Sequence, residues 1–282
     1  MNLRDLFPEA VVNQETGQGP EWLTLPLDGQ FIHFPLETLS QREQALLNLQ
    51  ESQPALQSSV QDVWHQFLVQ KKGGLPTKLE RVQLLYLEHG IPLSSDLLDL
   101  FYGLLPHLTA LVELHATRTL LVLDQTIPFE VEALIQDILP AVESDFGTKL
   151  TICFGNSWTK LQAEELRQVF DSEYQLFSDF VPLKGSEQTI SFAKMALWAR
   201  SGQLNLGVIP EKIRHYIDES KDMVDIIEAM WTSQTNLVQT AQKLFMHRNS
   251  LQYKLDKFHS LSGLNLKNLD DLAFCHLLML NG

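Results

Sequence analysis

The sequence predicts an α+β protein that is predominantly helical, with a central sheet domain followed by an all-α C-terminal domain. Apolar residues make up 44% of the 282 residues, which is enough to fill packed cores. Residues 77–182 alternate β-prone runs with amphipathic helical runs. Beyond residue 185 the strand signals fade and only helical patterns continue.

The first 76 residues are predicted to form an N-terminal segment with a hairpin and helices, for sensing or oligomerisation. Residues 22–36 place Asp28-Gly29 between β-prone flanks, which is a hairpin signal. Ser40 opens a helix with a capping box, and helical spacing continues over residues 59–72. Gly73-Gly74 then breaks the pattern, so a domain boundary is expected there.

Residues 77–184 are predicted to form an α/β domain. The expected strands are residues 82–89, 109–116, 118–124 and 149–155, and the expected helices are residues 94–105, 129–146 and 161–177. This order predicts an antiparallel or mixed sheet with helices on one face.

Residues 185–282 are predicted to be entirely helical, with a helix-turn-helix at residues 236–259. Helices are expected at residues 190–201, 210–218, 223–232 and 269–280, on either side of a two-helix unit.

Charge is distributed unevenly along the chain. The net charge is −14, yet residues 234–282 carry five Lys or Arg and only three Asp. Residues 1–233 therefore carry 16 basic and 32 acidic side chains. A locally positive helix on an acidic body can still contact nucleic-acid phosphate.

The two-helix unit begins at Asn236, a good N-cap, with Gln239 in the reciprocal capping position. Its first helix runs over residues 237–244, where Ala241 permits a close helix crossing. Its second helix begins near His247. One face of that helix carries a core-facing stripe, made of Leu251, Leu255 and Phe258.

The other face of the second helix carries side chains suited to DNA. Arginine binds guanine bidentately, asparagine binds adenine, and lysine, serine and tyrosine reach phosphate. The predicted DNA-binding residues are Asn236, Gln239, His247, Arg248, Asn249, Ser250, Tyr253, Lys254 and Lys257. The alternative is a solvated helix face in an all-α bundle, and Phe245 stands in the turn where such motifs often have glycine.

The same segment resembles the C-terminal helix-turn-helix of the PucR/CdaR family of bacterial transcription regulators. The residues that carry the resemblance are Ala241, Leu244, Phe245, His247, Arg248, Asn249, Ser250, Leu251, Tyr253, Lys254 and Leu255, followed by Gly263-Leu-Asn-Leu266 and by Asp270-Asp271. The family tolerates an aromatic residue in the turn, so the resemblance implies that Phe245 is compatible with DNA binding.

The middle of the chain resembles, more weakly, the degenerate GGDEF-like domain that precedes this module in many family members. The resemblance rests on the element order and on residues 150–177. A cyclase would need a Gly-Gly-(Asp/Glu)-Glu-Phe turn, whereas the sole Gly-Gly, at residues 73–74, is followed by Leu75-Pro76. Cyclase activity is therefore not expected.

Other chemistry is not indicated by the sequence. The histidines show no metal-binding grouping, and no P-loop, dinucleotide fingerprint or nucleophile elbow occurs. Cys153 and Cys275 are interpreted as buried thiols, and His276 as a core contact. We expect no catalytic residues, no metal, no cofactor and no enzyme activity. We expect no signal peptide, and no apolar run reaches membrane-spanning length, which predicts a cytoplasmic protein.

The sequence therefore predicts a DNA-binding transcription regulator that places a recognition helix in the major groove and responds to a metabolic signal. Its expected partners are double-stranded DNA, a second copy in a homodimer or higher homo-oligomer, and a small-molecule effector, but no membrane. An alternative is a nucleotide- or metabolite-binding signalling protein derived from a GGDEF-type enzyme. A helical scaffold that has lost DNA binding is a third possibility, against which the intact face on the second helix argues.

Overall fold

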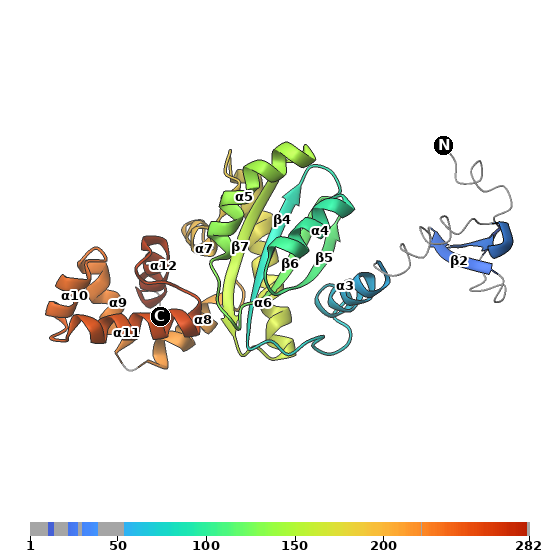
Figure 1. Ribbon diagram of the computed structural model, residues 1–282. Coiled ribbons are helices and arrows are strands. Elements are labelled where there is room, and N and C mark those ends of the chain that lie inside the picture. Colours follow the sequence, from blue (N-terminus) through green and yellow to red (C-terminus); the bar gives the residue numbers. More distant parts are fainter. Residues whose placement is uncertain (1–10, 14–21, 28–29, 39–53, 221, 281–282) are drawn as a thin grey trace. The chain divides into compact units, whose positions relative to one another are not determined.

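The computed structural model describes residues 11–13, 22–27, 30–38, 54–220 and 222–280 (Figure 1). The chain divides into two compact units, residues 1–60 and 61–282. The helix expected from Ser40 lies outside the described residues. The boundaries expected at residues 76 and 184 stay predictions.

The first unit contains a three-stranded antiparallel sheet in the order β1-β3-β2. Its strands are β1 (Val11–Asn13), β2 (Trp22–Leu27) and β3 (Gln30–Pro35), followed by the 3-10 helix η1 (Leu36–Thr38). Leu27 pairs with Gln30, so the predicted hairpin strands are confirmed. The turn residues Asp28 and Gly29 lie outside the described part of the chain.

The second unit contains a five-stranded sheet in the order β5-β6-β4-β7-β8. Its strands are β4 (Arg81–His89), β5 (Leu108–His115), β6 (Arg118–Asp124), β7 (Leu150–Thr159) and β8 (Thr189–Ile190). All pairings are antiparallel except that of β7 with β8, so the sheet is mixed, as predicted. Strand β6 lies between β4 and β5, which is the split βαβ arrangement.

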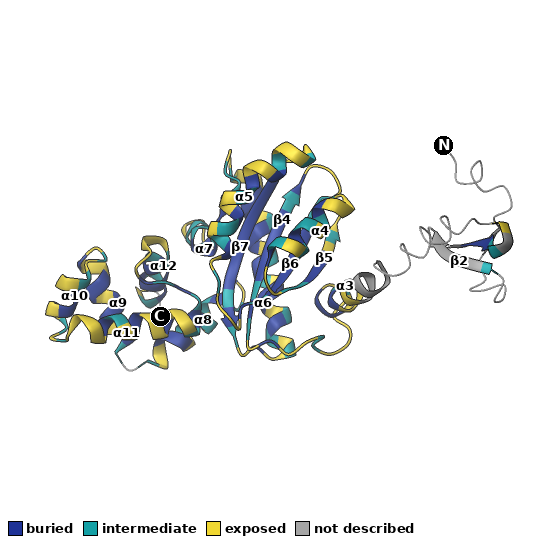
Figure 2. Ribbon diagram, in the orientation of Figure 1, coloured by how far each residue is buried: buried dark blue, intermediate teal, exposed yellow. Residues whose placement is uncertain are grey.

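Helices cover both faces of this sheet, so the expectation of helices on one face was wrong (Figure 2). Leu85 and Leu87 of β4 face a core with α4 (Ser95–Leu104) and α5 (Val131–Phe146). Leu84 and Tyr86 face the opposite core, which includes α3 (Pro54–Leu68) and α6 (Ala163–Phe180). The near-continuous apolar run of β4 is the physical reason, because consecutive side chains of a strand point to opposite faces.

Strand β8 occupies the position where the sequence predicted the start of a helix. After the 3-10 helix η2 (Val181–Leu183), residues Thr189–Ile190 pair with β7. Helix α7 (Phe192–Ser201) begins only after Ser191, whose side chain caps it by accepting a hydrogen bond from the Lys194 amide. A two-residue strand has too few side chains to show any periodicity.

The remaining helices are α8 (Ile209–Asp218), α9 (Met223–Thr232), α10 (Leu237–Lys243), α11 (Arg248–Ser262) and α12 (Leu269–Leu280). They share one continuous apolar core with the α6 face of the sheet. Phe192 of α7 connects the sheet to the C-terminal helices. Its ring packs edge-on against Trp158 of β7 and Phe274 of α12, with ring centroids 6.1 Å and 5.9 Å apart. The C-terminal helices are thus packed directly onto the sheet.

Candidate nucleic-acid interface

Helix α10 begins at Asn236, whose Oδ1 accepts hydrogen bonds from the amides of Val238 (3.1 Å) and Gln239 (3.2 Å). The predicted N-cap is therefore confirmed. The predicted reciprocal bond from Gln239 is wrong, because the Asn236 amide donates to the Ser233 carbonyl at 3.0 Å. Both Asn236 and Gln239 are exposed, while Ala241 is buried against the core, as expected for a close helix crossing.

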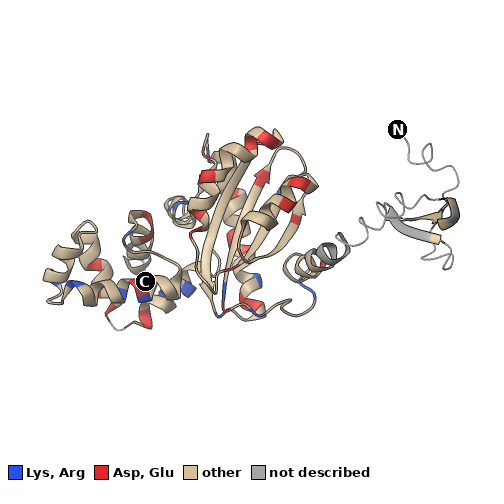
Figure 3. Cartoon of the chain, in the orientation of Figure 1, with Lys and Arg blue, Asp and Glu red and all other residues tan. Residues whose placement is uncertain are grey.

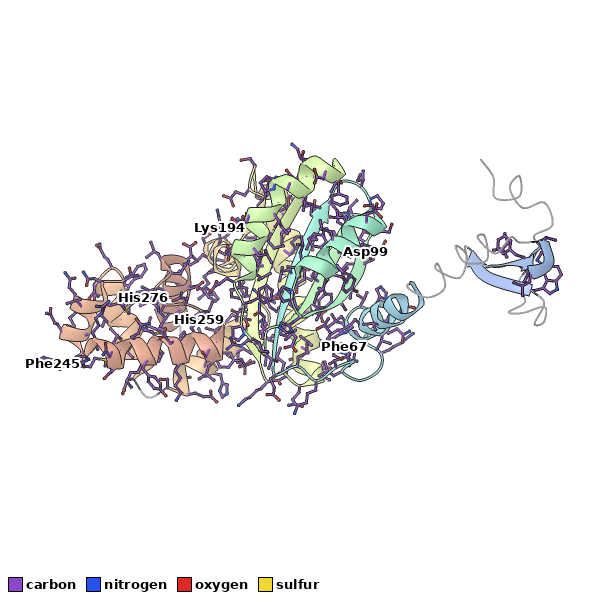
Figure 4. The ribbon with its side chains drawn as sticks, viewed as in Figure 1. Phe67, Asp99, Lys194, Phe245, His259 and His276 are labelled. Carbon is purple, nitrogen blue, oxygen red and sulfur yellow. The ribbon has the colours of Figure 1, made fainter. Side chains whose placement is uncertain are left out.

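The turn between α10 and α11 is built around Phe245, which has a φ of 51°. This left-handed conformation is the one that glycine adopts freely, and for other residues it costs about 1–2 kcal/mol. The Met246 amide closes the turn by donating to the Ala241 carbonyl at 3.0 Å. The side chain of Phe245 is 98% exposed and projects away from the helices (Figure 4).

Helix α11 buries one side and presents the other to solvent. The predicted core stripe is confirmed, since Leu251, Leu255 and Phe258 are each at most 1% exposed. His247 is the N-cap, and its Nδ1 accepts a hydrogen bond from the Asn249 amide at 3.2 Å. The position of His247 is therefore set by capping, which leaves only Nε2 for an external partner.

The structure brings most of the predicted DNA-binding residues together on the exposed side of α11. A groove of about 680 Å³ is lined by Asn249, Ser250, Tyr253, Lys254 and Lys257, together with Glu219, Ser220, Phe258 and Leu261. His247 and Arg248 stand at the start of the same helix, whereas Asn236 and Gln239 lie at the start of α10. Lys and Arg positions along α11 are blue in Figure 3.

Lys254 differs from the other predicted residues because it is half-buried and already paired. Its Nζ lies 2.6 Å from Oδ2 of Asp222, in the segment between α8 and α9. Within the described part of the chain, Arg248 and Lys257 form no ion pair. Asp222 and Glu219 place acidic groups beside the exposed face of α11. Neither was predicted, because both lie outside the local helical pattern of residues 236–259.

The C-terminal end of α11 is held by the sheet. Gly263 caps the helix in a left-handed conformation with a φ of 79°. Asn156 Nδ2 on β7 donates to the Ser262 carbonyl at 2.7 Å, and Thr159 Oγ1 donates to the Leu261 carbonyl at 2.9 Å. These bonds satisfy carbonyls that a helix end leaves without partners, so β7 fixes the direction in which α11 points.

Beneath this contact lies the buried carboxyl of Glu173 on α6. Its Oε1 accepts hydrogen bonds from the Asn156 amide (2.9 Å) and from Trp158 Nε1 (2.8 Å), and its Oε2 accepts one from the Tyr86 hydroxyl (3.1 Å). Burial raises the pKa of Glu173 to about 7, although the three donors act in the opposite direction. Sequence spacing gave no sign of this network.

The described residues contain no group of three or more His, Cys, Asp or Glu side chains placed to hold a metal ion. His276 stacks on Trp231 with ring centroids 4.6 Å apart, which confirms it as a packing contact. Cys153 and Cys275 are free, buried thiols, as predicted, and burial raises the pKa of both. No helix in the described ranges is long and apolar enough to cross a membrane.

Comparison with known proteins identifies one matching family domain and two proteins of similar sequence. The PucR C-terminal helix-turn-helix domain matches residues 223–280. A "Leucine-rich protein" of Streptococcus dysgalactiae subsp. equisimilis is 35% identical over 280 residues, which cover 99% of each chain. An "Uncharacterized protein YxkF" of Bacillus subtilis (strain 168) is 20% identical over 279 residues, covering 95% of this chain and 93% of that protein.

Among solved structures, the chain is similar to a regulator of polyketide synthase expression from Bifidobacterium adolescentis. The sequence identity is 14% and the TM-score is 0.36, over 83% of this chain and 96% of that one.

Proposed function

Because residues 223–280 match the PucR C-terminal helix-turn-helix domain, we propose that the chain is a transcriptional regulator that binds specific DNA with the N-terminal end of α11 in the major groove. The main support for this proposal is that the side chains of Arg248 and Asn249 are exposed and available to a partner. Both are exposed on the first turn of α11, and neither side chain hydrogen-bonds to a described residue. The opposite side of the helix is buried in the core, which holds the helix in place and fixes the position of the two side chains.

The surrounding residues suit the phosphate backbone. Ser250, Tyr253 and Lys257 line the groove beside α11 and can donate hydrogen bonds or supply positive charge. Asn236 and Gln239 mark the exposed N-terminus of α10, where helix amides favour an anion. In this proposal Arg248 and Asn249 read bases, while the other predicted residues position the helix.

One helix-turn-helix covers only a few base pairs, so we further propose a homodimer or higher homo-oligomer that reads paired half-sites. Residues 1–76 and 77–184, which are acidic, would then sense a metabolic signal or build the oligomer. Residues 185–282 would form the DNA-binding part.

Replacing Arg248 or Asn249 by alanine is expected to weaken binding to the specific site by about 1–3 kcal/mol, which is roughly 5- to 150-fold. The loss arises because base-edge hydrogen bonds disappear while the phosphate contacts stay. The site is first obtained by selecting genomic fragments on the full chain, and affinities are then measured by fluorescence anisotropy against a scrambled duplex of equal length.

Lys78→Ala serves as a matched control, since it removes an exposed positive charge from the loop before β4. Its affinity for the selected site should equal that of the wild type. If Arg248→Ala and Asn249→Ala also bind the selected and scrambled duplexes like the wild type, α11 is not the reading helix.

Replacing Asp222 by asparagine is expected to strengthen binding to all DNA sequences alike. The Lys254–Asp222 pair is only partly buried and contributes little stability, yet Asp222 neutralises a positive charge beside the groove. Releasing Lys254 should steepen the slope of log affinity against log salt by about 0.9, the value for one extra phosphate contact. An unchanged slope in a salt titration would show that Lys254 does not meet DNA.

A further inference from the structure

A second cavity, of about 360 Å³, lies between the sheet and the C-terminal helices. It shares no lining residue with the groove beside α11. Its walls come from β4, from the start of α5, from β7, and from the chain between the last turns of α11 and the first turn of α12. A ligand in this cavity would therefore touch both the sheet and the end of the proposed recognition helix.

Three carboxylates in the cavity wall lack a cation. Burial and the charge of Glu130 raise the pKa of Glu132. Burial raises the pKa of Asp271 to about 7, and the charges of Asp270 and Glu132 act in the same direction. The Asn265 amide donates a hydrogen bond to Asp271 Oδ2 at 2.7 Å, which acts against this rise. In the described residues, Glu130, Glu132 and Asp271 form no ion pair, so no cation offsets their mutual repulsion.

The same cavity contains an unpaired guanidinium. Arg81 is half-buried, and burial lowers its pKa. Across the described ranges, its side chain forms neither an ion pair nor a hydrogen bond, which is unusual for a partly buried charge. His259 of α11 lines the same cavity. Partial burial lowers the pKa of His259, and the positive charge of Arg81 lowers it further. His259 lies on the part of α11 nearest the sheet (Figure 4).

A further polar group in the wall also lacks a partner. The Ser157 hydroxyl oxygen is shielded from solvent and makes no hydrogen bond to any described residue. Buried polar groups in native proteins are nearly always hydrogen-bonded. Beside these groups, Phe129, Phe154 and Leu264 add apolar surface. The cavity thus combines unpaired charges of both signs with an apolar wall.

We propose that this cavity binds a free α-amino acid. The ammonium group would be held by Glu130, Glu132 and Asp271, the carboxylate by Arg81, and the side chain by the apolar wall. The volume falls at the small end of the range for ligand sites. A lone metal ion does not fit, because the carboxylates do not form a metal-binding group, and a polyphosphate would meet an excess of negative charge.

A ligand bound in this cavity could alter DNA binding through the C-terminal end of α11. The cavity wall includes His259 and Gly263, which are the last turn and the cap of α11. An amino acid bound there would shift or fix the end of that helix. This second step rests on the proposed DNA-binding function, whereas the binding itself does not.

The test uses the full chain and the twenty standard L-amino acids as probes. We expect at least one amino acid to raise the melting temperature and to give a saturable heat in calorimetry. Its N-acetyl derivative, which lacks the ammonium group, and its amide, which lacks the carboxylate, should bind at least about tenfold more weakly, because each loses a charge-assisted hydrogen bond.

Arg81→Gln and Asp271→Asn should each weaken binding by about ten- to a hundredfold. Asp137→Asn is the matched control, because Asp137 is exposed on α5 and does not line the cavity, and it should bind normally. The proposal is overturned if none of the twenty amino acids binds, or if binding survives unchanged in both cavity variants. Calorimetry needs no DNA, so an amino acid that binds without altering DNA affinity would contradict only the second step.

Discussion

Replacing Gly263 by alanine is expected to lower the free energy of unfolding by about 2–5 kcal/mol. About 1–2 kcal/mol comes from forcing an alanine into a left-handed conformation, because the φ of Gly263 is 79°. The rest comes from overpacking, which costs about 1–3 kcal/mol. A Cβ at this position would collide with Asn156 Oδ1 and would lie 2.5 Å from the Ser157 carbonyl oxygen.

Gly147→Ala is a matched control for this experiment. Gly147 also caps a helix in a left-handed conformation, with a φ of 62°, yet a Cβ there would have no neighbour within 4 Å. It should cost only the conformational 1–2 kcal/mol. Urea denaturation of both variants isolates the effect of the close approach between α11 and β7. Equal losses in the two variants would mean that the contact contributes nothing beyond the helix cap.

The second large effect is expected from Glu173, whose carboxyl makes the wild-type protein less stable as the pH rises. The folded-state pKa of about 7 lies above the ordinary value of 4.5. Between these two values the folded protein keeps a proton that the unfolded chain has lost, so stability falls as the pH rises through this window. The loss amounts to about 3 kcal/mol at pH 8.

Glu173→Gln should remove this loss, because glutamine keeps the shape and the acceptor for Asn156 and Trp158 but carries no charge. We expect equal stability of variant and wild type near pH 4.5 and an advantage of about 3 kcal/mol for the variant at pH 8. Urea denaturation at both pH values measures the difference, and Glu164→Gln, exposed on the same helix, is the control. A difference between Glu173→Gln and wild type that does not depend on pH would refute the assignment. The raised pKa of Asp271 also makes the protein less stable as the pH rises. This effect is the same in variant and wild type, so it cancels when their stabilities are compared.

Much of the fold follows from local patterns. The bounds of the helices α5, α6 and α9 to α12 were predicted within a few residues, because each helix has an apolar face. The core stripe of α11 was predicted for the same reason. Strand β7 shows where such reasoning stops. It was expected to end at Gly155 but continues to Thr159. The polar residues Asn156 and Ser157 obscured the strand pattern, although they carry the contact with α11.

Sequence alone also identified the helix-turn-helix and the residues on its exposed face, because capping, helix period and motif are local properties of residues 236–259. The tertiary structure decided what surrounds them. It paired Lys254 with Asp222, 32 residues away, and joined Asn156 to Ser262 across 106 residues. It also placed Arg81 and Asp271 around one cavity. Contacts at such separations leave no period in the sequence, since they depend on how the sheet and the helices pack together.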